Sequence, residues 1–487
     1  MEPRKVNWFN EVRDTDGRIR PHYRSLYRQW RSIPAAKRKA LQIGSKELFS
    51  GDYSLDPLPR LITGSEFAIL KLGVEQRAKA IRAFLVDYYS GGRRWTKVMA
   101  PSILRAIVAR NYSANYLGKL NPDSIAFPFG PDIIRNQQGR WRVVEDSAGM
   151  IGGIGDLLAS RKIAMKLVPG YRRLLKDSNN PRDYFIELTR HFQSRAEQKK
   201  GIALVYLRRF EDEADHETRR LAGIFASLGV ETCWQAHPFK RLLIQDDGIF
   251  LENRKKRTRV GYLVLYSGPE QTENSCLLRG IQSIRSSERN NFGSRLIHEW
   301  NRIIDGKTIA SALVKGHAWS NFSPGVDFIN DKMFGLHVDS FIRLYLKESP
   351  ILESIPARSL AFRDRSGNWR LDREALRKVI RHKDRFVIKK ADEDGGSGVW
   401  IGHRFPRRFF QNLRNVIHKT PEKFIYQEFE HLSVVENRIV DLRLHAQVDC
   451  EKIILSNNPW GRANWLSGDG KVNLGSNGFT SPVVVLK

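Results

Sequence analysis

The stretch from Phe386 to Gly402, FVIKKADEDGGSGVWIG, constrains the fold more than any other part of the chain. Its β-branched and aromatic residues predict two strands, Phe386–Lys390 and Val399–Gly402, on either side of the turn Ala391–Gly398. The turn is acidic and rich in glycine, which favours a tight reversal of the chain. We therefore expect a hairpin here, with acidic residues and glycines at its tip.

The tip of this hairpin has the composition of a phosphate site. Successive glycines allow backbone N–H groups to point into one concavity, and Lys389 or Lys390 beside it would add a positive charge. The residues of the tip are Gly395, Gly396, Ser397 and Gly398. The alternative is an ordinary hairpin with a polar tip, because short glycine motifs also match by chance.

A second hairpin is predicted earlier in the chain. Phe127–Arg135 and Arg140–Asp146 have strand composition, and Asn136–Gly139 is a turn between them. Asp132 and Glu145 would then lie on paired strands, where two carboxylates on one face can bind a single cation. The alternative is a surface hairpin whose acidic side chains are solvated.

The middle of the chain predicts an α/β unit. Ile202–Leu207 (IALVYL) is a continuous apolar run, which is typical of a buried parallel strand. A predicted helix, Glu213–Leu228, and a second strand, Val230–Trp234, follow it, and Gly248–Leu251 and Val260–Tyr266 predict further strands. Alternation of strand, helix and strand indicates a right-handed crossover.

Apolar spacing and capping residues predict the helices elsewhere, with Ser65 as the N-cap of the first. They span Ser65–Tyr89, Pro101–Ala114, Asp156–Leu167, Gly293–Gly306, Met333–Leu346, Leu371–Arg381 and Arg404–Lys419. Pro350–Ala361 is expected to be a linker, and Lys423–Phe429 a strand. Arg438–Cys450 alternates strictly, which predicts one strand with an apolar face and a polar face that carries Asp441 and Arg443.

Composition limits the class of protein. A chain of 487 residues predicts roughly two to four domains. The chain has 82 Lys and Arg residues against 53 Asp and Glu residues, and this positive charge suits anionic partners. The basic residues are, however, spread along the chain without interleaved aromatic residues. We therefore favour a solvated basic surface over specific nucleic-acid binding. No apolar run approaches the ~20 residues of a membrane span, no secretory signal is evident, and the three cysteines are far apart, so we expect a cytoplasmic location.

Taken together, these motifs make the chain resemble the circularly permuted ATP-grasp family, which is related to glutathionylspermidine synthase-type ligases. The matching stretches occur in family order: Leu55–Thr63, Asp132–Asp146, Asn330–Lys332, Phe386–Gly402, Tyr426–Glu428, Asp441–Arg443 and Lys471–Leu486. The resemblance implies an α/β (α+β) fold, in which a permuted ATP-grasp core contains an inserted α/β, pre-ATP-grasp-like domain. We expect a metal-binding part of the core and N-terminal helices in 1–170, the inserted domain in 171–320, and the nucleotide-binding lobe with the last core strands in 321–487.

The resemblance further implies a ligase that uses ATP and Mg²⁺ to join a carboxylate, expected to be anionic, to an amine through an acyl-phosphate. It places Lys332, Lys389 and the glycine-rich tip on ATP, with Gln427 and Glu428 on the segment where the adenine lies. Arg443 would lie near the transferred phosphate, and Arg462 would hold a substrate carboxylate. Asp132, Glu145 and Ser147 would bind Mg²⁺.

The chain departs from the family pattern in two places. Ser147 stands where relatives have an asparagine, and a hydroxyl is a weaker metal ligand than an amide carbonyl. Tyr262–Tyr266 replaces a pair of arginines after the α/β unit. Two other functions therefore stay open: a basic RNA- or peptide-binding module without catalysis, and a small-molecule kinase.

Overall fold

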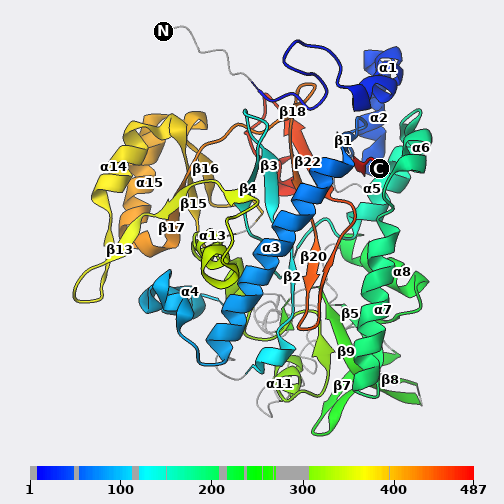
Figure 1. Cartoon of the computed structure of the whole chain (residues 1–487), viewed down its shortest axis with the longest axis vertical. Coiled ribbons are helices and arrows are strands. Elements are labelled where there is room, and N and C mark those ends of the chain that lie inside the picture. Colours follow the sequence, from blue (N-terminus) through cyan, green and yellow to red (C-terminus); the bar gives the residue numbers. More distant parts are fainter. Residues whose placement is uncertain are drawn as a thin grey trace, which may run out of the picture.

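The computed structural model describes residues 8–48, 54–111, 120–149, 151–207, 216–234, 239–254, 256–266, 268–269, 307–393 and 395–487 (Figure 1). Strands from both halves of the chain form its central sheet, in the order β11-β4-β3-β19-β22-β23, with β18 paired to β19. Their bounds are β3 Asp132–Arg135, β4 Trp141–Glu145, β11 Glu353–Ser354, β18 Val434–Val435, β19 Arg438–Arg443, β22 Trp460–Trp465 and β23 Phe479–Ser481. The antiparallel pairing of β3 with β19 joins the predicted metal hairpin to the C-terminal strands.

The long helix α3 (Gly64–Tyr89) crosses in front of this sheet and buries one face against it (Figure 1). Its N-cap is Thr63, so the prediction of Ser65 is wrong. The Thr63 hydroxyl accepts from the Glu66 N–H at 3.3 Å, and the Glu66 carboxylate accepts from the Thr63 N–H at 3.0 Å. This reciprocal pair is a capping box, which satisfies two N–H groups where Ser65 would satisfy one.

The predicted glycine-rich hairpin is confirmed as part of a separate lobe. Its sheet has the order β12-β17-β15-β16. The strands are β12 Ala357–Ser359, β15 Phe386–Lys390, β16 Val399–Ile401 and β17 Phe424–Glu428, and the helices are α14 Arg373–Arg381 and α15 Arg407–Lys419. An apolar core between helices and sheet includes Leu376, Ile388 and Phe410. The prediction missed the hairpin of β13 (Ala361–Arg363) and β14 (Trp369–Leu371).

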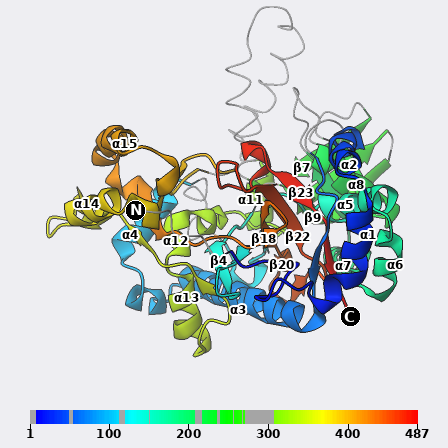
Figure 2. The same ribbon diagram turned by 90° about the horizontal axis from the view of Figure 1, so that it is seen from above.

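The α/β unit lies on the opposite side of the central sheet from this lobe (Figure 2). The strand predicted as buried and parallel is confirmed: β5 pairs in parallel with β6 and β9. The unit comprises β5 Ile202–Leu207, β6 Glu231–Trp234, β7 Lys240–Gln245, β8 Gly248–Asn253, β9 Lys256–Leu265, β10 Trp319–Ser320, α7 Arg182–Gln198, α8 His216–Ser227 and α11 Ile309–Val314. The predicted helix Gly293–Gly306 lies outside the described residues, and so do residues 213–215 of the predicted helix Glu213–Leu228.

Two predicted strands are each broken in two. Phe127–Arg135 divides into β2 (Phe127–Phe129) and β3, and Arg438–Cys450 divides into β19 and β20 (Ala446–Val448). At both breaks the chain passes between the central sheet and a smaller one of order β2-β20-β21, with β21 at Ile453–Leu455. The first break falls at Gly130-Pro131, where proline lacks the N–H that a ladder needs.

The predicted helix Met333–Leu346 is also broken, into α12 (Lys332–Gly335), α13 (Val338–Phe341) and a π-helical turn at Ile342–Leu346. The predicted helix from Pro101 ends as α4 at Ala109, and residues 112–114 lie outside the described part. Helix α5 (Asp156–Leu167) has the predicted bounds.

The N-terminal helices lie near the C-terminus (Figure 1). They are α1 (Arg24–Ser32) and α2 (Ala35–Leu48). The short α6 (Tyr171–Leu174) follows α5 in the chain. Strand β1 (Arg60–Ile62) pairs in parallel with the final strand β24 (Val483–Val485). In the described ranges, no helix combines the length and apolar character that crossing a bilayer requires.

Candidate active site

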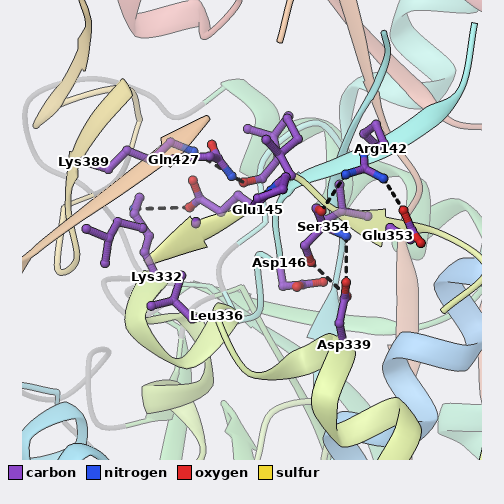
Figure 3. Close-up of a pocket in the computed structure, with 17 residues that line it drawn as sticks. Arg142, Glu145, Asp146, Lys332, Leu336, Asp339, Glu353, Ser354, Lys389 and Gln427 are labelled. Atoms are coloured by element: carbon purple, nitrogen blue, oxygen red, sulfur yellow. Dashed lines mark hydrogen bonds and ion pairs between the residues drawn. The ribbon is translucent and has the colours of Figure 1, made fainter. Parts of the chain in front are cut away.

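A cavity of about 630 Å³ lies between the glycine-rich hairpin and the central sheet. Eleven of the thirteen predicted site residues line it: Asp132, Glu145, Ser147, Lys332, Lys389, Gly395, Gly396, Gln427, Glu428, Arg443 and Arg462. Ser397 and Gly398 are in the same turn but do not line the cavity. A neighbouring hollow of about 310 Å³ shares Glu145, Lys332, Lys389 and Gln427 with it (Figure 3). The two hairpins, separated by some 250 residues in sequence, therefore face one space.

Two lysines project into this space. Lys389 is buried on β15, and its Nζ donates to the Val144 carbonyl at 3.4 Å. Burial lowers its pKa to about 8, although Glu145 opposes the shift. The Nζ of Lys332 lies 3.2 Å from Glu145 Oε1 (Figure 3). Lys390, the alternative to Lys389, instead pairs with Glu393 in the turn.

Helix α12 fixes the position of Lys332. Asp331 is its N-cap, and the carboxylate accepts from the Met333 N–H at 2.8 Å. Arg110 donates to both oxygens of Asp331, at 2.6 and 2.8 Å. Sequence reasoning missed Arg110, which also lines the cavity. This ion pair ties the end of α4 to the helix that carries the lysine.

The predicted metal hairpin brings its acids together. Asp132 and Glu145 are register partners on β3 and β4, with an irregularity in the ladder directly after Asp132. The pKa of Asp132 would be raised by burial, but Arg443 and Arg462 outweigh that effect and lower it to about 2. Both arginines contact Asp132 at 2.7 Å. Asp441 lies on the other side of Arg462, 2.6 Å from its Nη2.

The oxygen donors of this hairpin fit Mg²⁺ in type. Glu145 and Ser147, two positions apart in the chain, both line the cavity together with Asp132. Among the described residues, no three acidic, histidine or cysteine side chains gather as in a site built by protein alone. Mg²⁺ commonly binds through one or two carboxylates together with substrate phosphates. The hairpin therefore suits a metal that arrives with a triphosphate.

Sequence reasoning missed the residue that holds this hairpin. Arg77 of α3 is fully buried, and it donates to both oxygens of Asp146, between Glu145 and Ser147, through Nε at 2.7 Å and Nη2 at 2.5 Å. It also donates to Asp339 at 2.6 Å and to the Leu352 carbonyl at 2.8 Å. With Asp146 directed toward α3, the residues before and after it face the cavity. A charged residue within the apolar stripe of α3 was the available signal.

We expect Arg77→Lys to reduce the free energy of unfolding by about 1.5–3 kcal/mol, because lysine cannot reproduce the forked, charge-assisted hydrogen bonds. Denaturant titration measures the change. Arg105→Lys, at an exposed position on α4, is the matched control and should stay within about 0.5 kcal/mol of the parent. An Arg77→Lys variant as stable as that control would contradict a clamping role.

The glycine-rich turn rests against the C-terminal loop. Gly395, Gly396 and Gly398 all have positive φ angles, of 66°, 83° and 61°. A side chain on Gly396 would meet Ser476 Oγ at 3.0 Å and Asn473 Oδ1 at 3.1 Å. The Nζ of Lys471 donates to the Gly396 carbonyl at 3.0 Å and lines the cavity. The predicted turn thus closes one side of the cavity.

Gly396→Ala should weaken ATP binding about tenfold, because it combines backbone strain with a clash against the loop that the turn contacts. Titration with a fluorescent ATP analogue measures the affinity. Gly367→Ala is the matched control, since Gly367 has a φ of 81° and open space around it. Equal affinity of the two variants would show that the turn does not contribute to nucleotide binding.

The segment between the lobe and the central sheet carries Gln427 and Glu428. The Gln427 side chain donates to the Val144 carbonyl at 3.0 Å, and the Glu428 N–H donates to the Pro356 carbonyl at 2.9 Å. His445, between β19 and β20, is buried, and burial lowers its pKa to about 3. It is therefore neutral, and its Nε2 donates to the Gly152 carbonyl at 3.2 Å.

The fold agrees with what comparison with known proteins shows. The family model of circularly permuted ATP-grasp type 2 proteins matches residues 59–226 and 299–456, and the chain belongs to that family. Its fold is therefore the circularly permuted ATP-grasp fold. A glutathione synthetase-like effector from Globodera pallida has a similar structure, with a TM-score of 0.53 and 10% identity over 93% of this chain and 98% of its own.

Curated relatives are more similar in sequence. "Putative glutamate--cysteine ligase 2-2" from Frankia casuarinae is 26% identical over 91% of this chain and 50% of its own length. "Putative glutamate--cysteine ligase 2-3" from Frankia alni is 24% identical over 92% and 50%, respectively. An uncharacterised protein from Synechocystis is 24% identical over 83% and 76%. The chain thus spans about half the length of the ligase-named relatives.

Proposed function

We propose that the chain is an ATP- and Mg²⁺-dependent ligase that joins a carboxylate to an amine. The observation that carries this proposal is the shared cavity, where Lys389 of the glycine-rich hairpin and Glu145 of the acidic hairpin line the same space. A triphosphate with its metal needs positive charge on one side and carboxylate ligands on the other. Membership of the ATP-grasp family and the ligase names of the relatives support the same class of reaction.

Each residue has a role that follows from its position. Lys389 and Lys332 neutralise phosphate oxygens, and the turn at Gly395–Gly396 excludes water from them. The neighbouring hollow offers apolar walls at Pro356 and Ile425 for the adenine, next to Gln427. Asp132, Glu145 and Ser147 would hold Mg²⁺, which supplies further charge neutralisation at the transferred phosphate. Arg443 would bind that phosphate, and Arg462 would bind the carboxylate substrate.

The proposed reaction has two steps, phosphorylation of the carboxylate and attack by the amine. A carboxylate oxygen attacks the γ-phosphorus, the bond to the β,γ-bridging oxygen breaks, and ADP leaves. The amine nitrogen then attacks the acyl carbon, phosphate leaves, and the nitrogen loses a proton to give the amide. Arg443 stabilises the negative charge that develops on the acyl-phosphate oxygens. His445 is a weak base because burial lowers its pKa, so we assign it no role in either step.

The test is release of ADP and phosphate from ATP with pairs of substrates, beginning with L-glutamate and L-cysteine, the pair in the relatives' names. Release that requires both an acid and an amine supports the ligase. ADP with a stable phosphorylated product would instead indicate a kinase. Failure to bind ATP, together with salt-sensitive RNA binding, would indicate a basic binding module and would contradict the proposal.

A further inference from the structure

Asp132 is a predicted metal ligand, yet arginines already occupy its carboxylate. Oδ1 accepts from Arg443 through Nε at 2.8 Å and lies 2.7 Å from its Nη2. Oδ2 lies 2.7 Å from the Nη2 of Arg462. A carboxylate has about four acceptor positions, so these contacts leave about one. A dication at that position would also lie beside two guanidinium groups, which repel it.

The two arginines differ in what else holds them. Arg462 also binds the buried carboxylate of Asp441, through Nε at 3.1 Å and Nη2 at 2.6 Å. Among the described residues, Arg443 makes one other hydrogen bond, from Nη1 to the Gly152 carbonyl at 3.2 Å. Separated from Asp132, Arg462 would stay on Asp441. Arg443 would be left with a single neutral acceptor, which is a weaker partner than a carboxylate.

The surroundings give Arg443 room to turn into the cavity, which its side chain already lines. The facing residue on the chain before β3 is Gly130, where a Cβ would lie 3.1 and 3.2 Å from Cγ and Cδ of Arg443. The absence of a side chain there leaves the stem of the arginine unobstructed. An anion in the cavity would be the strongest available partner for the released guanidinium.

We propose that Asp132 withholds Arg443 from the phosphate until Asp132 takes up the metal, and then releases it. This inference rests on the proposed function. Metal and phosphate then bind cooperatively, because the Asp132 carboxylate is exchanged between the metal and Arg443. The coupling is reciprocal: phosphate that binds Arg443 also frees Asp132 for the metal. Arg443 is then a phosphate-binding residue only in the metal-loaded state.

The test is calorimetric titration of the full chain with a non-hydrolysable ATP analogue, AMPPNP, with and without MgCl₂. In Asp132→Asn we expect the metal-free affinity to rise at least threefold over the parent, because a neutral amide holds Arg443 less strongly. We expect the gain on adding Mg²⁺ to fall at least tenfold. A metal-free affinity equal to or below that of the parent would overturn the inference.

Arg443→Met tests the same inference from the other side and keeps every predicted metal ligand. Its metal-free affinity should equal that of the parent, and its affinity with Mg²⁺ should be at least tenfold weaker. A similar loss in both conditions would contradict the withheld arginine. The matched control is Asp56→Asn, which removes the buried partner of Arg438 at the far end of β19, 3.1 Å away. It should bind as the parent does, and a parent that binds AMPPNP in neither condition would refute the proposed function itself.

Discussion

Glu145→Gln is expected to lower the turnover number by about 10²–10³-fold while the chain stays folded. The substitution keeps the shape of the side chain but removes the negative charge that faces Lys332 at 3.2 Å. A carboxylate ligand to a metal that neutralises a transferring phosphoryl group contributes several kcal/mol to catalysis, and each 1.4 kcal/mol is about tenfold in rate. Steady-state release of ADP, measured against Mg²⁺ concentration, gives the effect.

The control for this variant is Glu187→Gln. Glu187 lies on α7, is largely exposed, and pairs with Lys452 at 3.3 Å, away from the cavity. Loss of an exposed ion pair costs about 0–1 kcal/mol, so we expect unchanged turnover. Full activity of Glu145→Gln, with the same Mg²⁺ dependence as this control, would remove Glu145 from the site.

Lys389→Met is expected to lower kcat/KM for ATP by about 10²–10³-fold and, at the same time, to stabilise the chain. The loss of activity follows because the buried ammonium group would neutralise phosphate in a water-excluded site. The gain in stability follows because burial lowers the pKa of Lys389 to about 8, whereas an unfolded lysine has a pKa of about 10.4. A pKa shift of that size corresponds to a cost of about 3 kcal/mol for burying the charged lysine, and a methionine at this position does not have that cost.

The stabilisation by Lys389→Met should decrease as pH rises. Below pH 8 both the folded and the unfolded lysine are protonated, and the folded chain bears the whole cost of the buried charge. Between about pH 8 and 10.4 the folded lysine is neutral first, so the cost falls as pH rises. Denaturant titrations should therefore show the largest gain for Lys389→Met near neutral pH and little gain at pH 10. A variant that is less stable than the parent at pH 7 would contradict the buried ammonium group.

Elements with a strong local pattern were predictable from the sequence. The apolar run at Ile202–Leu207, the hairpin strand at Phe386–Lys390 and the helix at Asp156–Leu167 occur with the predicted bounds. That Asp132 and Glu145 belong to one hairpin was also predictable, but their direct pairing was not. The register of Ile133 with Val143 would place Val144 opposite Asp132, and the irregularity after Asp132 brings Glu145 there instead. The capping box at Thr63 was readable from the sequence, since Glu66 stands three residues later.

What the sequence did not reveal depends on contacts between distant segments. Arg438–Cys450 has an unbroken alternating pattern, but the chain changes sheets within it. The break in Phe127–Arg135, by contrast, was marked in the sequence by Gly130-Pro131. The change within Arg438–Cys450 is set by tertiary packing, which local propensity does not report. The arginine pairing of Asp132 likewise needs β19 next to β3 and β22 next to β19, an order of strands that the residue spacing within one segment does not determine.

The central claim is that two hairpins far apart in sequence bind one triphosphate from opposite sides. A crystal structure of the chain with Mg²⁺ and AMPPNP tests it most directly. We predict the phosphates in the cavity, with Lys389 Nζ within hydrogen-bond distance of a phosphate oxygen and the metal between the phosphates and Glu145. A nucleotide bound elsewhere, or phosphates in contact with only one of the two hairpins, would contradict the claim.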